Sequence, residues 1–288
     1  MKLQTEPGVF GPHELDELDE FFREHGFAIL RGLLTDELLA ELTAECTAAQ
    51  SQVAAGELDE RHGTTILVGA NEGGSGNTAT ETVVNYVTHV TEIALITRSA
   101  IVNPVIEGLV RRWIGDEAWL LEHHRFGVVY QDARPGRESG YTRIGWHSDW
   151  QSAPHRDMWP SVAFTIHIDA TSPANGFLRV VPDSHLWATP APYRNANDVE
   201  VPEGSAPWGG HTDTPPPFEM PLGFEKVPGE IPVYCEVGDV LFHDAYLWHS
   251  AARATDDDTI RRHVRGGFYV GEEPTEAVED DFVKNAAR

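Results

Sequence analysis

The stretch that decides the fold is Gly145-Trp-His-Ser-Asp-Trp150, because it places an imidazole and a carboxylate two residues apart. On an extended strand, residues i and i+2 point to the same face, so we expect His147 and Asp149 to project side by side. Such a pair supplies two ligands of a 2-His-1-carboxylate triad, which holds Fe(II) and leaves coordination positions open. The third ligand is expected far downstream, on a strand that returns beside the first.

The candidate for this third ligand is His249, at the end of the run Gly238-Asp-Val-Leu-Phe-His-Asp-Ala-Tyr-Leu-Trp-His249-Ser250. It follows Asp149 by 100 residues, which is long enough for several strands between them. His243 is a rival for the same role, but the Gly-Asp and His-Ser frame favours His249. The alternative for all three residues is an ordinary polar role in the core or on the surface.

The composition is that of a globular protein with 288 residues, 41% hydrophobic and 23% charged, and we expect a single domain over 1–288. The formal net charge of −25 disfavours binding to nucleic acid or to anionic membranes, so the expected partner is a small molecule. Cys46 and Cys235 form no pairing motif, and no apolar leader or membrane-length run is visible. These features predict a cytoplasmic protein.

The periodicity of the chain changes near residue 118. Residues 1–117 are predicted to be mostly helical, with helices over 12–25, 35–56 and 104–114 and a strand over 27–30. Residues 118–272 read as short strands with Gly and Pro between them, which is typical of an all-β sandwich or barrel; the strands are expected at 119–121, 126–130, around 147, and at 161–168, 177–181, 229–235, 239–242 and 265–270. The proline-rich insert over 188–229 is predicted to be a long loop that acts as a lid, and residues 273–288 an acidic tail. Residues 69–77 are predicted to form a glycine-rich loop, whose spacing does not match a phosphate-binding motif.

Three motifs together resemble one known family. The run His147-Ser-Asp-Trp150, the segment from Asn175-Gly176 to Pro182-Asp-Ser-His185, and the segment from Gly238-Asp239 to His249-Ser250 and Arg261 are similar to the phytanoyl-CoA dioxygenase family, which includes ectoine hydroxylase. The resemblance covers roughly residues 14–272, but the insert over 188–229 departs from ectoine hydroxylase. It implies a double-stranded β-helix (jelly roll) that uses Fe(II), 2-oxoglutarate and O2, with His147, Asp149 and His249 as the metal ligands.

The far carboxylate of 2-oxoglutarate needs a cation, best an arginine that binds it through two hydrogen bonds. Alignment with the family at Phe268 places Arg261 there. Alternation puts Arg261, His263, Arg265 and Gly267 on one polar face, and Arg262 on the other. A polar cavity takes the first face and favours Arg261, whereas an apolar cavity would favour Arg262.

Further candidates come from the resemblance and from position along the strands. Thr165 and Ser250 are expected to contact the cosubstrate, and Gln131 to line the same pocket. Tyr130, Trp150, His155 and Trp159 are candidate substrate contacts, although aromatic side chains are more often part of a core.

The predicted function is oxidation of an unactivated C–H bond of a small organic molecule, with release of succinate and CO2. Asp149 argues for hydroxylation or another oxidation, because related halogenases have Ala or Gly at this position. Two alternatives remain: a cupin-like jelly-roll enzyme that does not use 2-oxoglutarate, and a catalytically silent binding relative.

Overall fold

The structure of this chain is a computed structural model that describes residues 7–62, 65–67, 83–124, 126–133, 145–152, 157–190, 208–221, 223–252, 254–256 and 258–274. The predicted glycine-rich loop at 69–77, most of the insert and most of the acidic tail lie outside these residues. Within them, no helix is both long enough and apolar enough to cross a membrane.

The described part of the chain forms two facing sheets. The large sheet has the order β1 (Val9–Phe10), β2 (Phe27–Leu30), β12 (Val240–Asp244), β7 (Ser161–His167), β14 (Arg261–Tyr269), β6 (Val129–Ala133), β4 (Val83–Val87) and β3 (Thr65–Leu67), and β5 (Trp119–Leu120) also pairs with β14. The small sheet has the order β11 (Ile231–Val233), β8 (Leu178–Val180) and β13 (His249–Ala251). The hairpin of β9 (Thr189–Pro190) and β10 (Trp208–Gly209) stands apart. Every pairing between these strands is antiparallel except that of β1 with β2.

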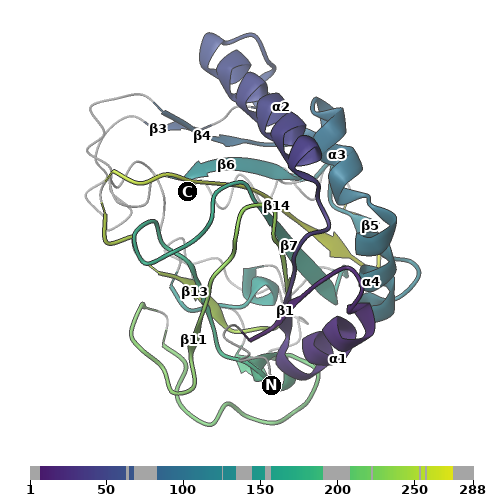
Figure 1. The fold of residues 1–288 in the computed structure, drawn as a ribbon. Helices are drawn as coiled ribbons and strands as arrows, with labels where there is room; N and C mark the ends of the chain where they lie inside the picture. Colours follow the sequence, from purple (N-terminus) through teal and green to yellow (C-terminus); the bar gives the residue numbers. More distant parts are fainter. Residues whose placement is uncertain are drawn as a thin grey trace.

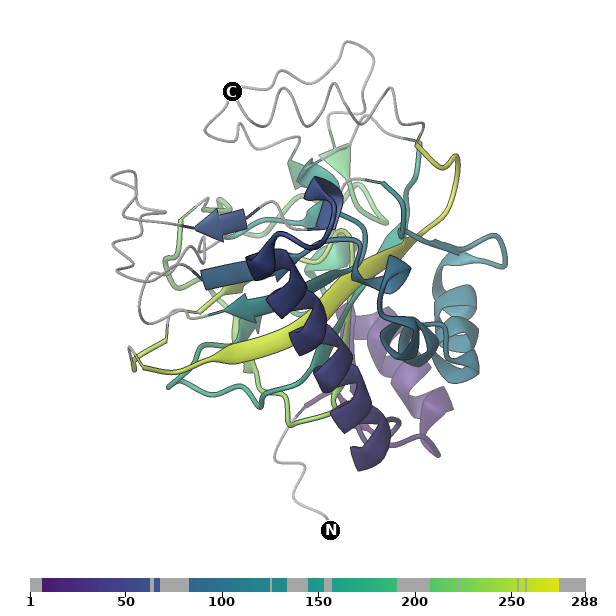
Figure 2. The same cartoon turned by 90° about the horizontal axis from the view of Figure 1, so that it is seen from above.

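Helices cover one side of the large sheet (Figures 1 and 2). They are α1 (Leu15–His25), α2 (Asp36–Ala55), α3 (Leu95–Ile101) and α4 (Pro104–Ile114). Elsewhere in the described part of the chain there are four 3-10 turns, η1 (Glu60–His62), η2 (Val90–Glu92), η3 (Asp149–Ser152) and η4 (Ser184–Leu186). The predicted start of α2 is confirmed, since the Thr35 hydroxyl accepts a hydrogen bond from the Leu38 amide at 3.2 Å. Gly26 ends α1 in the left-handed conformation, as its position predicted.

Alternation along the strands explains the layers. On β12, Val240 and Phe242 pack into the main core under the helices, whereas Leu241 points toward the small sheet. The main core also takes Phe164 and Ile166 from β7, and the second cluster joins Leu241 to residues of β8 and β11. The molecule therefore consists of three layers in the order helices, large sheet and small sheet. The predicted jelly roll is confirmed.

The differences from the sequence-based prediction have local causes. Strand β14 begins at Arg261 rather than at 265, because its first residues are polar side chains that alternation alone does not identify as a strand. Helix α3 and strands β3 and β4 were not predicted, since they are short. The mostly helical N-terminal part also contributes β1, β2, β3 and β4 to the large sheet.

Candidate active site

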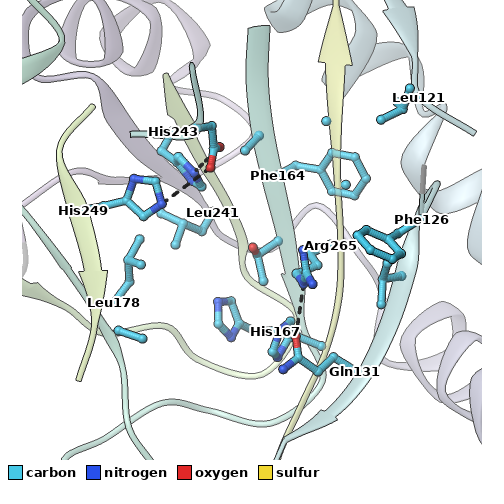
Figure 3. Close-up of a pocket in the computed structure, with 18 of the residues that line it drawn as sticks. Leu121, Phe126, Gln131, Phe164, His167, Leu178, Leu241, His243, His249 and Arg265 are labelled. Carbon is cyan, nitrogen blue, oxygen red and sulfur yellow. Dashed lines mark hydrogen bonds and ion pairs between the residues drawn. The ribbon is translucent and has the colours of Figure 1, made fainter. Parts of the chain in front are cut away.

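A cavity of about 330 Å³ lies between the two sheets (Figure 3). Its walls come from residues of β6, β7, β12 and β14 on one side and of β8 and β13 on the other. The residues that carry polar chemistry into it are Gln131, His147, Asp149, Thr165, His167, His243, His249, Arg261, His263 and Arg265. Its size and its mixture of apolar and polar walls are those of a small-molecule site.

The structure brings His147, Asp149 and His249 together. One potential ligand atom from each lies within 4.8 Å of the other two. Asp149 Oδ1 is 4.0 Å from His147 Nε2 and 3.8 Å from His249 Nε2. Within the described residues, this is the group of His, Cys, Asp and Glu side chains whose geometry could hold a metal ion.

The local backbone differs from the expected strand. His147 forms an isolated antiparallel bridge with His249, with N–O distances of 3.0 and 2.9 Å, and Asp149 begins the 3-10 turn η3. The bridge explains why the two imidazoles lie side by side, with ring centroids 4.2 Å apart. The strand argument was therefore wrong for this segment, although the expected convergence of the two side chains is present.

Hydrogen bonds to the backbone set the orientation of both imidazoles. His147 Nδ1 lies 2.8 Å from the Gly145 carbonyl, and His249 Nδ1 lies 2.9 Å from the Leu247 carbonyl. Each Nδ1 must carry the proton to donate to a carbonyl, so each Nε2 presents its lone pair to the cavity. Burial lowers the pKa of His147 and lowers that of His249 further, which keeps both rings neutral and able to bind a metal.

His243, the rival ligand, contacts the carboxylate instead. Its Nε2 is 3.1 Å from Asp149 Oδ2, on the opposite carboxylate oxygen from the one that faces His147 and His249. Burial raises the pKa of Asp149, but the hydrogen bond and charge of His243 and the nearby His249 outweigh it, so the net pKa lies below its ordinary value. His243 thus orients Asp149 through the carboxylate oxygen that faces away from His147 and His249.

Two histidines and an arginine line another part of the cavity. Arg261 is only 5% exposed, and His167 and His263 form a cross-strand pair between β7 and β14. Both nitrogens of His167 and the Nδ1 of His263 are buried, with no hydrogen-bond partner among the described residues. Burial and the charge of Arg261 lower the pKa of His167 to about 3 and also lower that of His263, so both are neutral beside a fixed cation.

Arg261 and Arg262 point in opposite directions, as alternation predicted. Arg261 lines the cavity, whereas Arg262 forms a two-fold hydrogen bond to Asp169 at 2.9 and 2.7 Å and is not part of the lining. Gly176 explains why Arg261 fits. Its φ is +83°, and a Cβ there would lie 2.8 Å from both Arg261 Nη1 and the Ala252 carbonyl.

The other predicted contacts divide by strand alternation. Thr165 and Gln131 line the cavity. Ser250 points away from it, because it alternates with His249 and Ala251, and its hydroxyl lies 3.2 Å from Arg179 Nη2. Tyr130 lies between Val129 and Gln131 on β6 and is buried in the main core under the helices.

The predicted aromatic contacts divide in the same way. Trp159 lines the cavity and meets Tyr269 edge to face, with ring centroids 5.6 Å apart. Trp150 is buried outside the lining, against the backbone of Gly209 and near the ring of Tyr246. His155 lies outside the described residues.

The sequence reasoning did not assign a role to several residues of the lining. They are Tyr86, Phe126, His167, His263, Arg265 and Tyr269. For His263 and Arg265 the signal was available, since both alternate with Arg261 on one face of β14. Tyr86 and Phe126 had no such signal, because their neighbours in the cavity are distant in the sequence.

Comparison with known proteins supports this geometry. The model of the family described as phytanoyl-CoA dioxygenase (PhyH) matches residues 22–263. No curated protein sequence matches this chain. The match confirms the resemblance seen in the sequence and, with it, the expected class of non-haem iron, 2-oxoglutarate-dependent dioxygenases.

Solved structures share the fold at low sequence identity. The chain is similar to EctD from S. alaskensis with 2-oxoglutarate and 5-hydroxyectoine (TM-score 0.58, 15% identity, 88% of this chain and 75% of that one). It is also similar to the non-haem α-ketoglutarate-dependent epimerase SnoN from nogalamycin biosynthesis (TM-score 0.57, 19%, 90% and 84%). A third similar structure is EvdMO1 (TM-score 0.55, 20%, 91% and 50%), of which this chain spans half the length. Since the family model covers most of the chain, this protein belongs to the phytanoyl-CoA dioxygenase family.

Proposed function

We propose that this protein uses Fe(II), 2-oxoglutarate and O2 to hydroxylate a C–H bond of a small organic molecule within the cavity between the sheets. His147, Asp149 and His249 hold the iron, Arg261 binds the far carboxylate of 2-oxoglutarate, and Thr165 and Gln131 line the site. The observation that carries the proposal is the convergence of two neutral imidazole nitrogens and one carboxylate on a single point.

The three side chains suit Fe(II) in chemistry as well as in position. Both Nε2 atoms are left unprotonated by the backbone hydrogen bonds of Nδ1, and His243 holds the second oxygen of Asp149. Three protein ligands leave positions for a chelating keto acid and for O2. A carboxylate as third ligand also occupies the position that a halide takes in related halogenases, which favours oxygen insertion.

Arg261 is placed to bind a dicarboxylate. A buried guanidinium forms strong paired hydrogen bonds with a carboxylate, and its neighbours His167 and His263 add polar groups without adding charge. Because the chain carries a net charge of −25, a local cation is needed to attract an anionic cosubstrate.

The cofactor supplies the oxidation: one oxygen atom of O2 enters succinate as 2-oxoglutarate loses CO2, and the other enters the substrate as a hydroxyl group. The chain contributes orientation and exclusion of water. The triad fixes where oxidation occurs, Arg261 fixes the keto acid, and the cavity wall fixes which C–H bond faces the iron. The cytoplasmic location and the small-molecule partner remain part of this proposal.

The test is an anaerobic titration of the purified protein with Fe(II) and then with 2-oxoglutarate, followed by visible absorption. A chelated keto acid gives a weak metal-to-ligand charge-transfer band, which we expect for the natural sequence. Arg261→Ala should lose the band at moderate 2-oxoglutarate concentration, because the far carboxylate loses its cation. Arg262→Ala is the matched control and should keep it, since Arg262 pairs with Asp169 outside the cavity.

Each outcome has a separate meaning. Iron binding without the band would contradict the use of 2-oxoglutarate and favour the cupin-like alternative. An absence of iron binding would contradict the triad. Loss of the band in Arg262→Ala alone would show that Arg262, and not Arg261, binds the far carboxylate of 2-oxoglutarate.

A further inference from the structure

Arg265 lines the cavity, is exposed, and has no acidic partner among the described residues. Other described arginines pair with a carboxylate; they include Arg23, Arg31, Arg61, Arg98, Arg112, Arg179 and Arg262. The chain has 46 acidic and 21 basic residues, so an arginine without a carboxylate is unexpected. Its position in the wall of a cavity suggests that its partner is a ligand.

The polar neighbours of Arg265 hold it in place without neutralising it. Its Nε lies 3.1 Å from Gln131 Oε1 (Figure 3). The same oxygen lies 3.2 Å from His263 Nε2. Gln131 Nε2 donates to the Tyr86 hydroxyl at 3.2 Å, and the guanidinium carbon of Arg265 is 5.8 Å from the centre of the Tyr86 ring. Among the described residues only Nε has a hydrogen-bond partner, so the two terminal nitrogens of the guanidinium are placed to bind a carboxylate.

The sheet register places Arg265 within reach of a small molecule bound near the iron ligands. Arg265 pairs with Thr165 on β7, and Thr165 pairs with Leu241 on β12, two residues before His243. Two strand spacings of about 4.8 Å and two residues of about 3.3 Å put the backbones of Arg265 and His243 roughly 12 Å apart. The side chains of Arg265 and of the metal ligands take up part of this distance, so the space that is left between them suits a compact molecule.

The rest of this wall is apolar. Leu121, Phe126, Trp159 and Tyr269 line the cavity, and Phe126 is 55% exposed although it is a large hydrophobic residue. Gly267 keeps the wall open in front of Tyr269, because a Cβ there would lie 2.9 Å from the tyrosine ring. A ligand here would have an apolar body beside a single cation.

The charges of the cavity lining support the same conclusion. Among the described residues of the lining, the charged side chains apart from histidines are Asp149, Arg261 and Arg265. Asp149 belongs to the metal site and Arg261 to the cosubstrate, which leaves Arg265 without a charged partner among the described residues of the lining. We propose that Arg265 binds the carboxylate of the substrate, which is a compact organic acid with an apolar body. This inference rests on the proposed function.

The experiment measures binding to the Fe(II)- and 2-oxoglutarate-loaded protein by calorimetry under anaerobic conditions. The probes are benzoate, phenylacetate and hexanoate, the carboxamide of each, and phenyl phosphate. We expect the acids to bind about tenfold more tightly than their amides, as a charge-assisted hydrogen bond allows. Arg265→Met should abolish this preference, Arg265→Lys should restore part of it, and Arg262→Met, on the opposite face of β14, should leave it unchanged.

The outcomes are distinguishable from a failure of the proposed function. The Fe(II)–2-oxoglutarate band should be the same in Arg265→Met as in the natural sequence, which also shows that the variant is folded. Loss of that band in Arg265→Met would make Arg265 the cosubstrate clamp and overturn the inference. An acid preference that persists in Arg265→Met, no binding of any acid, or tight binding of phenyl phosphate alone would also overturn it. Absence of the band in the natural sequence would overturn the proposed function instead.

Discussion

At the scale of single residues, the site depends on positions that carry no reactive group. Gly176 was part of the Asn175-Gly176 motif in the sequence, where it could be read only as a turn. In the structure Asn175 holds that turn through its amide, which donates to the Ala170 carbonyl at 2.7 Å. Gly176 then leaves the space that the guanidinium of Arg261 occupies.

Gly176→Ala tests this reading. A methyl group at 176 would meet a backbone carbonyl and Arg261 at 2.8 Å, and the φ of +83° is itself unfavourable for alanine. We expect a loss of about 1–3 kcal/mol of unfolding free energy in urea and a weaker affinity for 2-oxoglutarate in the charge-transfer titration. Gly229→Ala is the matched control, because Gly229 has a φ of +78° but no atom within 4 Å. Equal 2-oxoglutarate affinities in the two variants would show that Gly176 does not position Arg261.

The candidate ligands could be predicted from the sequence because their spacing reflects chemistry, but the backbone that presents them could not. His147 lies in a single bridge rather than in a strand, and the partner residue His249 is 102 positions away. Ser250 and Tyr130 were expected in the site from their neighbours in sequence. Strand alternation, which becomes definite only when the register is known, turns both away from the cavity.

At the scale of elements, strand β14 shows what alternation can and cannot predict. The division of its residues into two faces placed Arg261 and Arg262 correctly. The start of the strand was missed, because Arg261, Arg262 and His263 are polar and a polar run does not by itself indicate a strand. Helices α2 and α4 were predicted closely, since Thr35 and Pro104 mark their first turns.

The Gly238-Asp239 motif has a structural role at the junction of β12 and β2. Asp239 is completely buried and accepts hydrogen bonds from Arg31 Nε and Nη2 at 2.9 and 2.8 Å. Oδ2, the oxygen that accepts from Arg31 Nη2, also accepts from the amide of Glu236 at 2.7 Å, which closes the turn before β12. The carboxylate therefore joins the end of one strand to the start of the next strand in the sheet.

Arg31→Met should destabilise this junction strongly, because it leaves a buried carboxylate without its cation. We expect a loss of roughly 3 kcal/mol in the unfolding free energy, measured by urea denaturation. The double variant Arg31→Met, Asp239→Asn removes the charge as well and should recover part of the loss. A loss below about 1 kcal/mol in the single variant would mean that the pair behaves as an exposed ion pair. Arg112→Met, which breaks a surface pair with Asp16, is the control.

At the scale of the whole molecule, the layers were predictable and the contents of the cavity were only partly so. The order of helical and strand-like segments indicated an all-β sandwich or barrel with helices at its N-terminal side, and the family resemblance implied that it is a jelly roll. The cavity, however, is assembled from β6, β7, β8, β12, β13 and β14, so its inventory of charges requires the strand order. That inventory contrasts with the rest of the chain: among the described residues, the lining holds two arginines and one aspartate beside the neutral His167 and His263, inside a protein of net charge −25.

These two electrostatic features predict opposite effects of pH. Acidification from neutral pH reduces the net negative charge, and less self-repulsion stabilises the fold. His167 acts in the other direction. Its pKa falls from 6.5 to about 3 on folding, so below pH 6.5 the unfolded chain binds a proton that the folded chain does not. Stability from this residue is complete above pH 6.5 and is lost as the pH falls toward 3, by up to about 1.4 kcal/mol per pH unit.

Salt separates the two effects. In roughly 1 M salt the Debye length is about 3 Å, so repulsion between surface charges is screened while the buried imidazole is not. We expect the unfolding free energy of the metal-free protein, measured in urea at high salt, to fall between pH 6.5 and 5. The unfolding free energy of His167→Gln should fall less steeply, because glutamine does not titrate. The remaining slope includes the other buried histidines whose pKa is lowered, His147, His185, His249 and His263. Parallel curves for the two proteins would show that His167 is protonated equally in the folded and unfolded chains, and that the cavity beside Arg261 is more hydrated than its burial indicates.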